Sequence, residues 1–109
     1  MKWPWIARDW DVLGLPWRVK LYPLGDETVG DADPEQQKIR LDPTQSDARA
    51  VQTWIHEMAH AIEDAIGVKF DHDLLEAVSR AIFCIWAHNP KAVLRLAYWM
   101  AECRRGKAK

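Results

Sequence analysis

The sequence predicts an α+β fold in which a short N-terminal β-sheet is followed by three helices. Three observations support this prediction. Segments with strand-like alternation come first, segments bounded by helix-capping residues come later, and 109 residues are the size of one domain. We therefore expect a single domain over residues 1–109, with a Trp-rich N-terminal segment at 1–16 and a frayed tail at 105–109.

Two strands are expected in the first half of the chain. The segment WRVKLY, residues 17–22, alternates and carries β-favouring side chains. The segment KIRL, residues 38–41, is a shorter candidate that is closed by Asp42 and Pro43. Residues 23–37, between the two candidates, are rich in Gly, Pro and Asp, which indicates a loop or a long hairpin connection.

Helix signals follow. Ser46 is a candidate N-cap, and the acid Asp47 follows it in the first turn. Gly67 suits the position just after a helix. Asn89 and Pro90 together suit a cap followed by a first turn. The expected helices are residues 47–66, then from Asp71 or His72 to just before Asn89, then from Pro90 to about Arg104.

The charge and composition exclude several classes of partner. Fifteen basic and sixteen acidic residues give a net charge of −1, so no general attraction to nucleic acid or to an anionic membrane is expected. The chain has no stretch with the length of a membrane span and no continuous apolar signal region. Its two cysteines lack metal or redox spacing, which favours a cytoplasmic protein with reduced thiols. The oligomeric state stays open.

Seven tryptophans are unusual in a chain of this length, and four of them lie within the first seventeen residues: Trp3, Trp5, Trp10 and Trp17. The simpler interpretation is a core packed with large rings, because aromatic side chains dominate burial energetics. The alternative is an exposed aromatic docking patch.

The segment WIHEMAHAIED, residues 54–64, contains the pattern His-Glu-x-x-His. At about 100° per residue, His56, Glu57 and His60 share one side of the predicted helix, opposite an apolar side. Two histidines four residues apart can place their nitrogens about 2.0–2.1 Å from one Zn²⁺. Glu57, beside them, can take a proton from a water that the zinc activates. The alternative is a solvated or hydrogen-bonded polar face without a metal.

The motif needs a third protein ligand, because catalytic zinc sites usually have three. Glu76 is preferred, since a turn at Gly67 lets the second helix fold back across the first. An acid set among helix-packing residues is also costly to bury without a partner. The alternative is an acid favoured only by the helix N-terminus.

Four further residues are considered for a role at the site. His72 is a possible third ligand, supporting group or oxyanion donor, or else a surface histidine. Asp64 either orients a ligand imidazole through its outer nitrogen or is a solvated helix-end acid. We expect His88 only to lie near a helix C-terminus, and Cys84 to fill the core.

With these residues in place, the chain resembles the zincin metallopeptidases, and most of all the gluzincins, in which a downstream glutamate on another helix is the third ligand. The run IRLDP…WIHEMAHAIEDAIGV…LLEAVSRAI…NP is similar to small metallopeptidase-like proteins of phages and prophages, loosely of the ImmA/IrrE type. The resemblance covers about residues 17–90. It implies a zincin-like domain with zinc on His56, His60 and Glu76, and with Glu57 as general base. It also implies that KIRL is the sheet-edge strand that aligns an extended peptide.

The expected function is therefore that of a zinc-dependent metallopeptidase acting on a peptide or protein substrate. The alternative is a non-catalytic zincin-fold interaction module with a structural or vestigial metal site, working through its Trp-rich N-terminus. The small size and the lack of an obvious oxyanion-stabilising motif favour that alternative. A third option is hydrolysis of a non-peptide amide.

Overall fold

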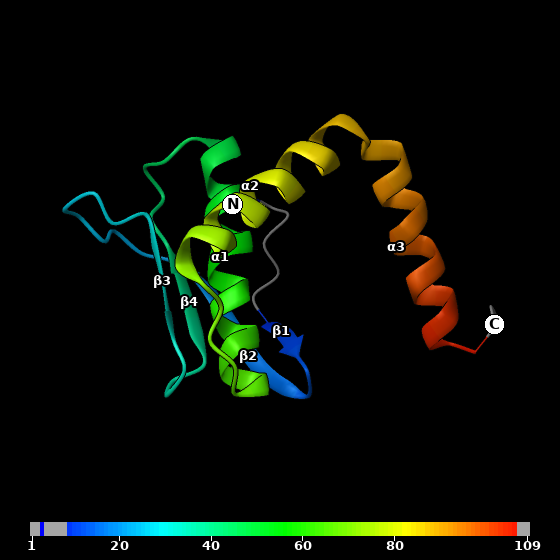
Figure 1. Ribbon diagram of the computed structural model, residues 1–109, viewed down its shortest axis with the longest axis horizontal. Coiled ribbons are helices and arrows are strands. Elements are labelled where there is room, and N and C mark those ends of the chain that lie inside the picture. Colours follow the sequence, from blue (N-terminus) through cyan, green and yellow to red (C-terminus); the bar gives the residue numbers. More distant parts are fainter. Residues whose placement is uncertain (1–2, 4–8, 107–109) are drawn as a thin grey trace.

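The computed structural model describes Trp3 and residues 9–106, and over these residues the predicted α+β organisation is confirmed (Figure 1). A β-sheet comes first and helices follow. The elements are β1 (Asp9–Val12), β2 (Leu15–Leu21), β3 (Gly30–Asp33), β4 (Lys38–Leu41), α1 (Asp47–Ile66), α2 (His72–His88) and α3 (Pro90–Arg104). Trp5 and residues 107–109 of the expected tail lie outside the described residues. None of the described helices has both the length and the apolar character needed to cross a membrane.

The strands form one sheet in the order β1-β2-β4-β3, in which β2 and β4 are parallel and the other pairs antiparallel. Two sequence predictions are wrong here. The segment 23–37 is not all loop, because Gly30–Asp33 pairs with β4 as strand β3. KIRL, which is β4, is not the edge strand, because it lies between β2 and β3. The register explains both results, since it sets Asp31 opposite Arg40 and the two side chains form an ion pair.

Strand β1 lies inside the Trp-rich N-terminal segment, where no strand was predicted. It joins β2 through the two residues Leu13 and Gly14, which have φ values of 53° and 91°. Positive φ at both positions is the geometry of a tight hairpin turn that matches strand twist. The Gly14 amide donates to Asp11 Oδ1 at 2.7 Å. This turn starts β2 at Leu15, two residues earlier than predicted.

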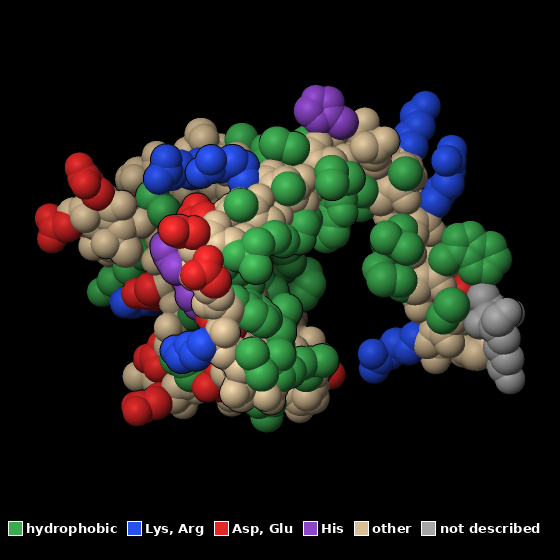
Figure 2. Space-filling view, viewed as in Figure 1, with side chains coloured by type: hydrophobic (Ala, Val, Ile, Leu, Met, Phe, Trp, Pro, Cys, Tyr) green, Lys and Arg blue, Asp and Glu red, His purple; other side chains and the backbone are tan. Residues whose placement is uncertain are grey.

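The core lies between the sheet and α1, and it confirms the packing interpretation of the tryptophans for part of the set. Trp3 and Trp17 are buried, and Trp10 packs on Trp54 with ring centroids 4.8 Å apart. In contrast, Trp86 and Trp99 are exposed on α2 and α3. Figure 2 shows hydrophobic side chains over α3 and over the side of α1 and α2 that faces it.

The helix ends follow the sequence signals with one exception. Ser46 accepts a hydrogen bond from the Arg49 amide, and Gly67 ends α1 in the left-handed conformation with φ 73°. Asn89 is the N-cap residue of α3, as predicted, but its side chain makes no capping hydrogen bond, which is the exception. Its side-chain amide donates instead to the Ile85 carbonyl of α2 at 2.8 Å. Asn89 is also the only residue between α2 and α3.

Helix α2 is mostly exposed, because only Leu75 and Ser79 are buried along it. Cys84 is exposed, so the prediction that it fills the core is wrong. His88 lies at the C-terminal end of α2, as predicted, and its Nδ1 is 2.7 Å from the Cys84 carbonyl oxygen. These residues extend beyond the part of α2 that packs on α1.

Candidate metal centre

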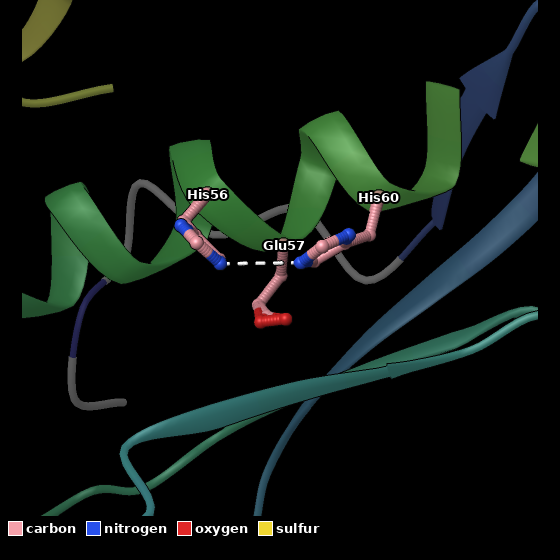
Figure 3. A group of neighbouring side chains, drawn as sticks. All are labelled: His56, Glu57 and His60. Carbon is pink, nitrogen blue, oxygen red and sulfur yellow. Dashed lines mark hydrogen bonds between the residues drawn. The ribbon is translucent and has the colours of Figure 1, made fainter. Parts of the chain in front are cut away.

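Helix α1 brings three polar side chains to one place. His56, Glu57 and His60 offer ligand atoms that all lie within 4.8 Å of one another (Figure 3). The Nε2 atoms of His56 and His60 are 3.1 Å apart, and Glu57 points from the same helix toward the sheet. One helical turn separates the two histidines, so the shared direction follows from the helix geometry.

Both sides of α1 contact the rest of the fold: Trp54, Met58 and Ile62 of the apolar side pack against the core, and the polar side packs against β3. Besides alanines, the buried residues of α1 are Thr53, Glu57 and Glu63, whereas Ile66 on the predicted apolar side is exposed. The close approach of β3 depends on Gly30. A Cβ there would lie 2.4 Å from Thr53 Cγ2 and 3.3 Å from Glu57 Cγ. The missing side chain at Gly30 therefore lets the strand close over Glu57.

Glu57 is a carboxylic acid held away from water. The residue is 6% exposed. Burial raises its pKa from 4.5 to about 7, with His60 opposing the rise and Asp31 adding to it. A carboxyl group with a pKa near neutrality can both accept and release a proton at the pH of a cell.

A buried carboxylate supports His60 from the same helix. Glu63 Oε1 lies 2.5 Å from His60 Nδ1, and the Phe70 amide donates to Glu63 Oε2 at 2.5 Å. The Phe70 amide, and after it His60, hold the pKa of Glu63 below its ordinary value. Glu63 therefore takes the orienting role that was considered for Asp64, which is exposed.

Glu63 was not among the predicted site residues, although the sequence contains a signal for it. Glu63 follows His60 by three residues, and that spacing places the two side chains on the same side of a helix. The Phe70 contact crosses the turn between α1 and α2, so it could not be read from the helical pattern.

Glu76 reaches the site from α2. Its Oε1 lies 3.1 Å from His56 Nδ1, a buried nitrogen without a partner of full hydrogen-bond geometry among the described residues. Its Oε2 lies 3.9 Å from Arg80 Nη2. The Glu76 side chain is 48% exposed, so the premise that this acid is buried among packing residues is wrong. The fold brings Glu76 to the His-Glu-x-x-His motif, but its carboxylate does not belong to the group of ligand atoms that converge within 4.8 Å.

These contacts fit a metal ion. Glu63 beside Nδ1 of His60 favours the tautomer with the proton on Nδ1, which leaves a lone pair on the Nε2 atom of His60. The Nε2 atom of His56 lies 3.1 Å from it, so one cation about 2.0–2.1 Å from each nitrogen can contact both. Burial lowers the pKa of His56, which keeps its imidazole neutral as a metal ligand requires. The donor set suits zinc, which prefers imidazole and carboxylate ligands.

His72, the other candidate ligand, starts α2 beside the site. Its ring centroid is 5.7 Å from that of His56, and the two rings meet edge to face. His72 is exposed and does not belong to the group of converging ligand atoms.

The surface is hollowed on both sides of Glu57. One hollow of about 250 Å³ lies toward the start of α1, and basic side chains from two helices, Arg49 and Arg80, line it. The other, of about 610 Å³, lies toward the end of α1 and includes His60 and Asp64. Gly30 and Glu57 line both, so the hollows meet at the candidate metal centre beside β3.

Comparison of the chain with protein-family models, curated proteins and solved structures gives no match. The functional assignment accordingly depends on the geometry of His56, Glu57 and His60.

Proposed function

We propose that this protein is a zinc-dependent hydrolase of peptide bonds, of the zincin type. One observation carries the proposal. Two imidazole Nε2 atoms lie 3.1 Å apart on one helix, and a buried carboxylic acid, Glu57, lies beside them. Helix stability alone gives no reason for this arrangement, since a buried acid without a partner destabilises a fold.

His56 and His60 would hold the zinc ion, which when bound supplies a Lewis acid that activates water and polarises a carbonyl. Glu57 accepts the proton from the attacking water, because its buried carboxylate has a pKa of about 7. The same carboxyl group then gives that proton to the leaving amine. Glu63 keeps the His60 ring oriented throughout.

The shape of the groove supports an extended peptide as the substrate. β3 pairs with β4 on one edge, and no described strand pairs with its other edge. Such an edge offers backbone donors and acceptors to an added strand. Because hollows lie on both sides of Glu57, a chain that follows β3 can place one peptide bond at the site and continue in both directions.

We propose Glu76 as the third ligand. Its carboxylate already lies against the ring of His56, and its half-exposed side chain has room to turn toward the Nε2 side. Zinc content of the purified protein tests this step. Glu76→Ala should lose the zinc that wild type and His72→Ala retain. Full retention by Glu76→Ala, with loss by His72→Ala, would give the third position to His72.

Glu57→Gln is the decisive test of the reaction. We expect the variant to keep stoichiometric zinc, while hydrolysis of an unfolded protein substrate falls by at least about 100-fold. Asp73→Asn is the matched control, because it neutralises an exposed acid that lines neither hollow and should keep full activity. Equal hydrolysis by Glu57→Gln and wild type would refute the mechanism.

The interaction-module alternative places its working surface in the Trp-rich N-terminal segment. Trp3 and Trp17 are buried, so these two rings are not available as an N-terminal docking surface. A closed site with four protein ligands would still favour that alternative. X-ray absorption spectroscopy at the zinc edge of the purified protein can detect such a site.

A further inference from the structure

Helix α3 is the least supported element of the molecule. No residue of α3 is buried by the described part of the chain. Its five large apolar side chains at 94–100 are between 54% and 71% exposed: Leu94, Leu96, Tyr98, Trp99 and Met100. A helix of 15 residues is only marginally stable in water without packing. A partner is therefore needed to stabilise α3.

The sequence of α3 shows that most of the helix surface is apolar and available to a partner. Three charged residues, Lys91, Arg95 and Glu102, are spaced four and seven residues apart and form one narrow stripe. Apart from Arg104 in the last turn, the rest of the circumference is apolar. Helices that are apolar over most of their surface are normally enclosed by other elements.

A matching groove lies between α1 and α2. Apolar residues of both helices, including Met58, Ile62 and Leu75, line a hollow of about 630 Å³. Its α2 wall is exposed at Leu74 and Val78, and the apolar surface continues to Trp86. Figure 2 shows hydrophobic side chains on both sides of the gap between this wall and α3.

Helix α3 cannot close onto the groove of its own chain. Only Asn89 connects α2 to α3, whereas antiparallel helices are usually joined by two to eight residues. Pro90 starts α3 and the Asn89 side chain is bonded to the Ile85 carbonyl, so both fix the junction. The result is a helix that stands apart from the body, to which only α2 connects it (Figure 1).

We propose that a second copy of this chain covers these surfaces, with α3 of each copy lying in the α1–α2 groove of the other. A two-fold arrangement covers the apolar surface of α3 and the apolar groove in both copies at once. Short hinges favour the exchange of a helix between two copies. The apolar surface exposed on one α3 is on the order of 500 Å². Two such helices and two matching groove walls would bury on the order of 2,000 Å², which is enough for a stable dimer. This inference does not depend on the proposed hydrolase activity.

Molar mass in solution tests the proposal. Sedimentation equilibrium between 1 and 100 μM (concentrations on the order of typical dimer constants) should give twice the 12.6 kDa chain mass. Leu96→Glu on α3 and Val78→Glu in the groove should each give monomers. Arg95→Glu, on the charged stripe of the same helix, is the control and should stay dimeric.

A linker variant keeps the test decisive if the glutamate variants fail to fold. Five Gly/Ser residues inserted after Asn89 should let α3 fold back, giving a monomer whose helix content by circular dichroism is unchanged. A wild-type monomer over the whole concentration range would overturn the proposal, as would dimers of both glutamate variants or of the linker variant. A monomer that binds anionic phospholipid vesicles through Leu96 would overturn it in favour of a membrane surface.

Discussion

Glu57 is buried at a cost to the stability of the fold. An ionised carboxylate in a site that is 6% exposed is poorly solvated, and its pKa of about 7 reflects this. The surrounding structure nevertheless keeps Glu57 buried, with Gly30 placing the β3 backbone against it. Departures of this kind from good packing are typical of functional positions.

At Glu63 the structure predicts a supporting role that metal affinity can measure. Glu63→Gln should weaken zinc binding by about tenfold or more, because the amide no longer offers His60 a charged acceptor. Competition with a chromogenic chelator gives the affinity. Asp64→Asn is the control on the neighbouring residue and should bind zinc as wild type does. Equal affinities for all three proteins would contradict the role.

At Gly30 the structure leaves no room for a side chain. Gly30→Ala should lower the free energy of unfolding by about 1–3 kcal/mol, since the new Cβ would lie 2.4 Å from Thr53 Cγ2. Thr53→Ser removes that methyl group and keeps the hydroxyl. The double variant should therefore lose less stability than the sum of the single variants, as measured by urea unfolding. Strict additivity would show that the two side chains do not meet.

Among the elements, those with their own sequence signals could be predicted and those built by their neighbours could not. The caps at Ser46 and Gly67 place α1 over residues 47–66, and the structure agrees at both ends. β3 has the sequence GDAD, which has little β propensity. It becomes a strand because β4 supplies the ladder and Arg40 pairs with Asp31. Such support comes from residues that are distant along the chain.

The connection from β4 to α1 predicts how stability depends on pH. The buried Asp42 accepts hydrogen bonds from the Thr44 hydroxyl and amide at 2.6 and 2.9 Å, and from the Leu24 amide at 2.9 Å. These bonds, those of Thr44 first, lower the pKa of Asp42 from 3.8 to about 2. The contribution of the Asp42 carboxylate to the free energy of unfolding is therefore complete above about pH 4. It is lost as the pH falls toward 2.

Asp42→Asn tests that dependence. The variant should be less stable than wild type at pH 7, and its stability should fall less between pH 4 and pH 2. Thermal unfolding across this range measures both effects. Asp26→Asn, in the exposed loop before β3, controls for the loss of one negative charge. Parallel curves for wild type and Asp42→Asn would exclude the contribution.

For the molecule as a whole, the sequence predicted site residues that lie on one helix. It did not predict features that depend on the arrangement of several elements. His56, Glu57 and His60 follow from spacing on α1 alone. The contact of Glu76 with His56 was predicted from a fold-back at Gly67, and the fold brings the two together at 3.1 Å. The edge position of β3 and the projecting α3 depend on the sheet order and on a one-residue hinge. Neither leaves a periodic pattern in the sequence.

Zinc bound at the centre would join α1 to α2 and so stabilise the whole domain. At a free zinc concentration 1,000 times the dissociation constant, the free energy of unfolding should rise by about 4 kcal/mol. For a chain of this size the thermal midpoint should then rise by on the order of 15 °C. Chelation should reverse the shift, and His56→Ala should show no shift at all. The protein concentration must be equal in every sample, because dimerisation through α3 would also raise the midpoint. Equal midpoints for wild type with and without zinc would contradict a metal bound across the two helices.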